Sequence, residues 1–194
     1  MFISSDLKSS LLPLTANLEA VAVPTWCPNK ITICSIYIPP PPDHPLNEKE
    51  LVDLIFQLPH PYLLVGDFNA HNIIWGSPHT FGKGKVIENV LNCSDTFLLN
   101  TGSETHFNIS SGSFSAIDLS LCDPKIAPSL SWEVFDDLHD SNHFPIIISS
   151  SSYKETTTRN FWNIKNANWS EFTSTTDILL SSLTISEEHN SKYF

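Results

Sequence analysis

The sequence lacks any long hydrophobic run and any signal-peptide pattern. Its most apolar stretch, residues 51–65, is broken by an aspartate, a glutamine and two prolines, whereas a bilayer-spanning helix needs about 18 consecutive apolar residues. The first 24 residues mix Asp6, Lys8 and Glu19 with apolar residues, rather than placing a basic start before an unbroken apolar core. We therefore expect no membrane partner and no secretion, and predict an intracellular protein, nuclear or cytoplasmic.

Cationic side chains are also scarce. Ten Lys and Arg face 21 Asp and Glu, for a net charge of -11, which is the wrong sign for a protein that holds nucleic acid through a broad basic surface. Any contact with nucleic acid must then be local. Four cysteines, with no C-x-x-C pair, stand far apart at Cys27, Cys34, Cys93 and Cys122, which disfavours both a zinc site and a disulfide framework.

What is present suits one folded domain. The 194 residues are 41% hydrophobic and 11% aromatic, enough to build a core. Apolar runs predict strands separated by turn residues, with a loop at 24–30, and Asn47 with Glu50 three residues later indicates a helix N-terminus. The predicted strands are 18–23, 31–38, 62–65, 97–99, 116–121, 132–135 and 145–149; the predicted helices are 48–58 and 86–91, the second after a loop at 82–85. Strands interleaved with helices indicate an α/β fold.

A Ser- and Thr-rich segment near residue 153 indicates the end of this domain. We predict one domain at 1–152 and a separate segment at 153–194. Apolar residues continue beyond the boundary at helical spacing, at Trp162, Trp169, Phe172, Ile178, Leu179 and Leu183. They predict one helix or two amphipathic pieces, too small to hold a core of their own.

Three segments carry side chains suited to phosphate chemistry. The first is Gly66-Asp67-Phe68-Asn69-Ala70-His71, which follows a buried apolar strand. It places a carboxylate and a carboxamide at the carboxyl end of a sheet, where α/β folds bind ligands. Asp67 can hold a cation or a proton, and Asn69 can donate to a phosphate oxygen. A simple Asx turn that closes the strand remains an alternative.

Asp118 and His143 occupy the other two segments. Asp118 lies within the apolar strand 115–121, so a buried Asp118 needs a histidine or a metal as its partner. His143 precedes the apolar strand that starts at Pro145. If Asp118 accepts its ring proton, the imidazole is fixed and more basic, which suits phosphate contact or general-base catalysis. The alternatives are an edge strand with Asp118 facing water and a surface position for His143.

Taken in this order, the segments resemble a known family. Gly66-Asp67-Phe68-Asn69-Ala70-His71, Ser115-x-Ile117-Asp118-Leu119 and Ser141-x-His143-x-Pro145-Ile146 are similar to the endonuclease/exonuclease/phosphatase superfamily, in particular the endonuclease domain of jockey-like non-LTR retrotransposons. The segments Ile36-Tyr37-Ile38-Pro39-Pro40 and Trp75-Gly76 fit the same pattern. The resemblance covers roughly residues 1–150. Residues 160–172 resemble the connector toward a reverse transcriptase.

This resemblance implies a DNase I-like fold, a four-layer sandwich of two mixed sheets with helices outside, here without its first strands. It implies phosphodiester hydrolysis assisted by Mg²⁺ or Mn²⁺, with DNA as substrate and a reverse transcriptase domain as partner. The implied roles follow residue by residue. Asp67 positions or deprotonates the water and binds metal, Asn69 and Tyr37 contact the phosphate, His143 contacts the scissile phosphate, and Asp118 orients His143.

Two departures from the family pattern predict weak metal binding. Asn142 stands where the family carries an aspartate, so a candidate metal ligand has lost its charge. The family's metal-binding glutamate belongs to strands upstream of the matched region. Because Mg²⁺ is held by few carboxylates, we expect a DNA-nicking activity that is weak or absent. The missing strands also predict an unpaired, apolar sheet edge.

Two other functions remain open. One is hydrolysis of a small phosphoester by the same superfamily chemistry, because an acidic surface tolerates a small substrate better than a duplex. The other is a non-catalytic remnant of a mobile element that binds partners through its exposed sheet.

Overall fold

A computed structural model describes residues 1–26, 29–40, 45–150 and 168–182. The chain divides into two compact units, 1–154 and 155–194, which are considered separately. The predicted boundary near residue 153 lies outside the described residues, as do Trp162 and Leu183. In the second unit one helix is described, α3 (Trp169–Ser182), where a helix was predicted. A bilayer-crossing helix is not found among the described residues.

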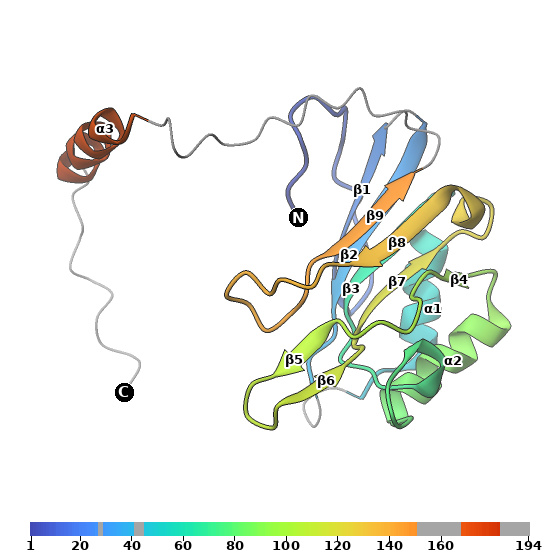
Figure 1. Ribbon diagram of the computed structural model, residues 1–194. Coiled ribbons are helices and arrows are strands. Elements are labelled where there is room, and N and C mark those ends of the chain that lie inside the picture. The colour runs from blue at the N-terminus through green and yellow to red at the C-terminus, as the bar shows by residue number, and fades with distance from the viewer. Residues whose placement is uncertain (27–28, 41–44, 151–167, 183–194) are drawn as a thin grey trace. The chain divides into compact units, whose positions relative to one another are not determined.

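The first unit is built on a five-stranded mixed sheet (Figure 1). Its strands, in spatial order, are β1 (Glu19–Trp26), β2 (Lys30–Tyr37), β3 (Tyr62–Asp67), β7 (Asp118–Cys122) and β4 (Phe97–Leu98). The β2–β3 pair is parallel and the other pairs are antiparallel. The central strand β3 is buried over its first three residues, as its continuous apolar run predicted.

Two helices pack on one face of this sheet. Helix α1 (Glu48–Gln57) begins at the N-cap Asn47, whose side chain accepts from the backbone N–H of Lys49, and it buries Leu51 and Leu54. Helix α2 (Gly82–Cys93) buries Ile87 and Val90. These residues form one core with the sheet residues that face them, including Cys34, Leu64 and Leu121. The predicted periodicities of both helices are thus confirmed.

A second, smaller sheet packs on the other face. It pairs β8 (Leu130–Val134) with β9 (Ile146–Ser150) in antiparallel register. Trp132 packs in a second core with Leu63 and Cys122 of the large sheet and with Leu99, the residue after β4. The α/β class with two sheets face to face is confirmed, but this second sheet has two antiparallel strands in the described residues, whereas the resemblance implied a mixed sheet.

The sequence did not predict two short strands. The hairpin β5 (His106–Asn108) and β6 (Ser113–Ser115) forms a separate two-stranded sheet. Short 3-10 helices lie at η1 (Ile73–Trp75) and η2 (Ala127–Ser129). Figure 1 shows the β5–β6 hairpin extending beyond the end of the large sheet, beside the start of β7.

Two predicted loops are part of regular elements. Strand β1 continues through Pro24 to Trp26, which is possible because it lies at the end of the strand order and Pro24 need not donate to a further strand. The carbonyl of Pro24 accepts from the N–H of Ser10 instead. Residues 82–85 form the first turn of α2 rather than a loop. Gly84 is required there because a Cβ at this position would lie 1.9 Å from the backbone oxygen of His71.

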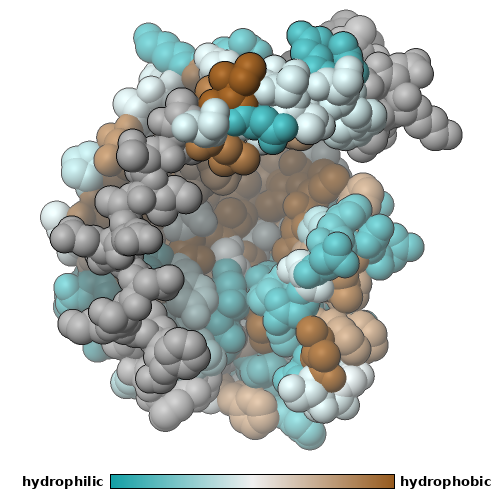
Figure 2. Space-filling model, turned by 90° about the vertical axis from the view of Figure 1, so that its left-hand side faces the viewer, coloured by the Kyte–Doolittle hydropathy of each residue, from teal (hydrophilic) through white to brown (hydrophobic). Residues whose placement is uncertain are grey.

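The edge of the large sheet is partly covered by the chain itself. Isolated bridges join Ser9 to Thr25 and Leu12 to Ala22 on β1, so the expected open edge is only partly present. Apolar side chains nevertheless remain exposed, among them Val21 on β1 and Ile147 on β9, at 45% and 42%. On the face drawn in Figure 2, apolar residues (brown) appear among hydrophilic ones (teal).

Candidate active site

Three neighbouring strands place polar side chains in one row. The ladder pairs Tyr37 at the end of β2 with Asp67 at the end of β3, and Asp67 with Asp118 at the start of β7. Residues paired across a ladder project on the same side of a sheet. Strands β2 and β3 can approach this closely because residue 66 is glycine. A Cβ at this position would lie 1.8 Å from the carbonyl oxygen of Ile36.

Asp67 and Asn69 form a compact turn directly after β3. Asp67 Oδ1 accepts from the N–H of Asn69 at 2.9 Å, and Asp67 Oδ2 accepts from Asn69 Nδ2 at 2.8 Å. Asn69 Nδ2 also donates to the carbonyl of Ile38 at 3.1 Å. Asn69 has φ of 46°, a left-handed conformation that asparagine tolerates better than most residues. The Asx turn and the candidate site are therefore the same feature, and both amide protons of Asn69 are already donated within the protein.

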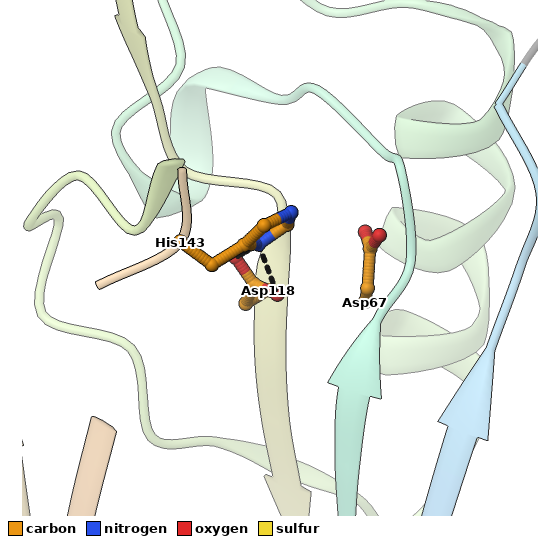
Figure 3. A group of neighbouring side chains, drawn as sticks. All are labelled: Asp67, Asp118 and His143. Carbon is orange, nitrogen blue, oxygen red and sulfur yellow. Dashed lines mark hydrogen bonds and ion pairs between the residues drawn. The ribbon is translucent and has the colours of Figure 1, made fainter. Parts of the chain in front are cut away.

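Asp118 and His143 form a close pair (Figure 3). His143 Nδ1 lies 3.1 and 3.0 Å from the two carboxylate oxygens of Asp118. A carboxylate can only accept, so His143 carries a proton on Nδ1 and directs Nε2 away from Asp118. Figure 3 shows Asp67 on the neighbouring strand, with its carboxylate near the imidazole. The expected partnership of Asp118 with a histidine is present.

Thr105 holds the start of β7 in place. Thr105 is fully buried. Its hydroxyl oxygen accepts hydrogen bonds from the backbone N–H groups of Ile117 and Asp118, each at 3.1 Å. The Thr105 carbonyl accepts from the N–H of Phe144, the residue after His143. One residue thus contacts the segments that carry both members of the Asp118–His143 pair.

His106 was not among the predicted site residues, yet it contacts two of them. Its ring centroid lies 4.7 Å from that of His143, and Asn142 Nδ2 lies 3.1 Å from His106 Nε2. His106 Nδ1 lies 3.3 Å from Ser115 Oγ. Asn142, the predicted metal ligand, therefore directs its amide nitrogen to a histidine. No local pattern in the sequence marks His106, because its contacts with His143 and Asn142 depend on the fold.

These residues surround a pocket of about 500 Å³. Of the residues predicted for the site, Tyr37, Asp67, Asn69, Asn142 and His143 line it, and Asp118 lies behind His143. The remaining lining residues are Pro40, His71, Pro78, Phe81, His106, Asn108, Ser113, Phe114, Ser115 and Ile117. The structure thus brings together every residue that the sequence singled out.

Burial sets the ionisation of the pocket residues. It raises the pKa of Asp67 above its ordinary value; the bonds from Asn69 oppose this change and the charge of Asp118 adds to it. Burial lowers the pKa of His71 and, together with the neighbouring His143, that of His106. The pocket therefore shifts the ionisation equilibria of these groups toward their neutral forms.

Asp67, Asp118 and His143 could share a cation. One ligand atom from each lies within 4.8 Å of the others. Each carboxylate keeps lone pairs beyond those used in its internal hydrogen bonds, and two carboxylates suit Mg²⁺ or Mn²⁺, whereas the imidazole favours the transition metal. The donor set present therefore fits a divalent cation.

Comparison with known proteins agrees with this geometry. A family described as endonuclease-reverse transcriptase matches residues 31–147, more than half of the chain and all of the row described above. The chain belongs to this endonuclease-reverse transcriptase family. A curated relative, the probable RNA-directed DNA polymerase from transposon BS of Drosophila melanogaster, is 29% identical over 113 residues. That match covers 56% of this chain but only 12% of the relative.

Solved structures support the same family assignment. The endonuclease domain of TRAS1, a telomere-specific non-LTR retrotransposon, is 26% identical with a TM-score of 0.66, over 76% of this chain and 70% of that one. A 3'-5' exonuclease from Neisseria meningitidis has a TM-score of 0.55 at 16% identity, over 75% of this chain and 70% of that one. The second likeness concerns the fold alone. This member of the endonuclease-reverse transcriptase family thus has the DNase I-like fold that its motifs implied.

Proposed function

We propose that this chain is a divalent-metal-dependent endonuclease that nicks DNA as part of a non-LTR retrotransposon. The observation that carries the proposal is the convergence of Asp67, Asp118 and His143: Asp67 and His143 line one pocket, and Asp118 contacts His143. These residues come from three separate segments of the sequence, and a purely structural role for any one of them would not require the other two. The similarity to the TRAS1 endonuclease domain supports DNA as the substrate.

The roles of the side chains follow from their contacts. Asp118 fixes the Nδ1 proton of His143, so Nε2 is the atom that accepts a proton from, or donates one to, the reacting phosphate or water. Asp67 lines the pocket with a carboxylate that can orient the attacking water. Tyr37 presents its hydroxyl from the neighbouring strand as a donor to the phosphate.

Asn69 has a different role from the one its motif implied. Its amide protons go to Asp67 and Ile38, so it positions the Asp67 carboxylate and can bind phosphate only by giving up one of these bonds. Asp67 and Asp118 would hold a Mg²⁺ or Mn²⁺ ion beside His143, and Asn142, the ligand that the motif implied, would contribute only its amide oxygen because its nitrogen is directed to His106. A bound divalent cation would polarise the phosphate and stabilise the leaving oxygen.

We propose a low turnover rate and a reverse transcriptase partner. Asn142 offers a neutral amide whose nitrogen is directed to His106, so it binds a cation more weakly than a carboxylate does. Because the curated relative is a probable RNA-directed DNA polymerase of which this chain spans 12%, the nick would supply a DNA end to a reverse transcriptase of the same element.

A plasmid-nicking assay tests the proposal. Supercoiled plasmid is incubated with the full chain in Mg²⁺, Mn²⁺ or EDTA, and conversion to the open circle is followed over time. Asp67→Asn and His143→Gln should each lower the rate by about 10²-fold or more, whereas Asp53→Asn, which removes an exposed carboxylate on α1, should not. Nicking that persists unchanged in both site variants would contradict the proposal.

A further inference from the structure

One edge of the large sheet carries two lysines on either side of a tryptophan. Trp26, the last residue of β1, is paired with Lys30, the first residue of β2. On the other side, the antiparallel bridge between Ser9 and Thr25 places Lys8 opposite Trp26. Paired residues project on the same side of a sheet, and the Nζ atoms of Lys8 and Lys30 lie 5.4 and 5.8 Å from the centroid of the Trp26 ring. These three residues are called the tryptophan row below.

The tryptophan row lies far from the candidate active site. Lys30 begins β2, and Tyr37, which lines the pocket, ends it. At the rise of an extended strand, this separation along β2 is about 23 Å. Figure 1 shows the end of β1 at the opposite end of the large sheet from the β5–β6 hairpin. A ligand on the tryptophan row therefore occupies a different site from a substrate in the pocket.

The two lysines of the row lack carboxylate partners in the part of the chain that the structure describes. Asp6, two residues before Lys8, is exposed and forms no ion pair with it, whereas Lys49 on α1 pairs with Asp53. In a chain with 21 acidic and ten basic residues, two unpaired ammonium groups beside one ring are unexpected, because like charges repel and cation–π attraction is weak at exposed sites. An anion bound between them would relieve this repulsion.

The indole ring offers a second kind of contact. Trp26 is 39% exposed and belongs to neither hydrophobic core, although burial of so large a ring would be favourable. Lysines beside an exposed aromatic ring are typical of surfaces that hold a nucleic-acid strand, because the cations bind phosphates and the ring stacks on an unpaired base. The chemistry of the row therefore favours a ligand that has both phosphates and bases.

We propose that the tryptophan row binds a single-stranded nucleic acid, with phosphates on Lys8 and Lys30 and one base stacked on Trp26. A duplex offers no free base face for the ring, because each base is covered by its neighbours. The strand is a second ligand, so double-stranded DNA remains the substrate of the pocket. In an endonuclease-reverse transcriptase family, an RNA held here would be brought to the DNA that is nicked. Single strands of RNA and DNA share the phosphates and base faces, and the test includes both.

A binding assay in EDTA tests the row without catalysis. The full chain is titrated against two fluorescent single strands of about ten nucleotides, an RNA and a DNA of the same sequence, and anisotropy gives each Kd. Lys8→Gln and Lys30→Gln should each weaken binding about threefold or more, and each should make the log–log salt slope shallower by about 0.7, the value for one phosphate contact on a single strand. Trp26→Ala should weaken binding about tenfold through the loss of one stacked base.

Matched controls separate the row from general effects of charge and exposure. Lys49→Gln removes the same charge from an exposed lysine on α1, and Phe56→Ala removes an exposed ring from that helix. Both variants should bind the strands as the parent does, and so should the pocket variant Asp67→Asn. Trp26→Phe keeps a ring for stacking and should retain most of the affinity, which tests stacking even if Trp26→Ala disturbs the end of β1. Circular dichroism checks the fold of each variant.

The outcomes separate this inference from the proposed function. Weaker binding of one or both strands by the row variants, with plasmid nicking unchanged, would support the inference and identify RNA, DNA or both as the ligand. Failure of the parent to bind either strand, or equal binding by the parent and the row variants, would overturn it. An equally large loss in Asp67→Asn would also overturn it, because the strand would then occupy the pocket. Absence of nicking in every metal would overturn the proposed function and leave the row unaffected.

Discussion

Asp67 and Asp118 are directly paired across the β3–β7 ladder, and the last residue of one strand thus faces the first residue of the other. Two carboxylates in this position repel each other. The arrangement persists because Asn69 donates twice to Asp67 and His143 donates to Asp118. Each of the two carboxylates therefore has a hydrogen-bond donor of its own. Such an arrangement of like charges is more typical of a functional site than of a structural one.

The Asp118–His143 pair predicts a loss of activity without a loss of fold. Asp118→Asn keeps the shape of the side chain but allows its amide to face the ring, so His143 is no longer held in one tautomer. We expect the nicking rate to fall by about 10²- to 10⁴-fold while the thermal unfolding midpoint changes little. An Asn variant that nicks at the parental rate would show that Asp118 does not orient the imidazole.

We expect two conservative substitutions of Thr105 to differ in their effect on stability. Thr105→Val removes the oxygen that accepts from the N–H groups of Ile117 and Asp118, leaving two donors without their partner at a cost of about 1–3 kcal/mol each. Thr105→Ser keeps the acceptor and should lose about 1 kcal/mol or less for the methyl group. Urea denaturation measures both. Equal destabilisation by the two variants would mean that the methyl group matters and the hydroxyl does not.

We expect alanine substitutions at two glycines of α2 to affect stability differently. A Cβ at Gly84 would overlap the backbone oxygen of His71, so Gly84→Ala should destabilise the chain by about 3 kcal/mol or more through overpacking. A Cβ at Gly82 meets nothing within 4 Å, and Gly82→Ala should be neutral or stabilising by up to about 1 kcal/mol. The calorimetric midpoint of Gly84→Ala should fall, whereas that of Gly82→Ala should stay the same or rise. A well-tolerated Gly84→Ala would show that α2 does not pack closely on the His71 segment.

Asp123 predicts a loss of stability in acid. Burial of Asp123 favours its neutral form, but bonds from the Lys125 N–H and from His60, at 2.9 and 2.7 Å, outweigh burial and hold its pKa below 3.8. A depressed carboxyl pKa contributes stability above the unfolded value of 3.8, and this contribution is lost as the pH falls through the folded value. Asp123→Asn should therefore be less stable than the parent at pH 7, and the difference should shrink below pH 4.

The measurement for Asp123 is urea unfolding at several pH values. Asp53→Asn provides a control, because Asp53 pairs with an exposed lysine on the same helix and such pairs contribute little. A stability difference for Asp123→Asn that stays constant from pH 7 to pH 3 would show that its charge is not involved.

Most regular elements could be predicted from local patterns. The continuous apolar run of β3 and the helical spacing of Leu51, Leu54 and Ile55 each reflect burial along one element, which nearby residues encode. The β5–β6 hairpin could not be found in this way. Its strands have three residues each, with mostly exposed or half-buried side chains, so they carry no apolar periodicity.

Residue roles depended on long-range contacts that no local pattern encodes. Residues 82–85 have the composition of a loop, yet they form the first turn of α2, where Gly84 packs closely against the His71 segment. Asn69 was expected to donate to a phosphate, but the Ile38 carbonyl and Asp67 already take its protons. His106 became a site residue only because the hairpin carries it beside His143.

The sequence by itself determined the positions of most strands along the chain, the helix faces and the residue types at Asp67, Asp118 and His143, because period and composition are properties of neighbouring residues. The tertiary structure decided that these three side chains lie close together at one site, which hydrogen bonds each one makes, and which aromatic rings stay exposed beside them. Those outcomes depend on the packing of segments separated by tens of residues. Their contact energies exist only once the chain has folded.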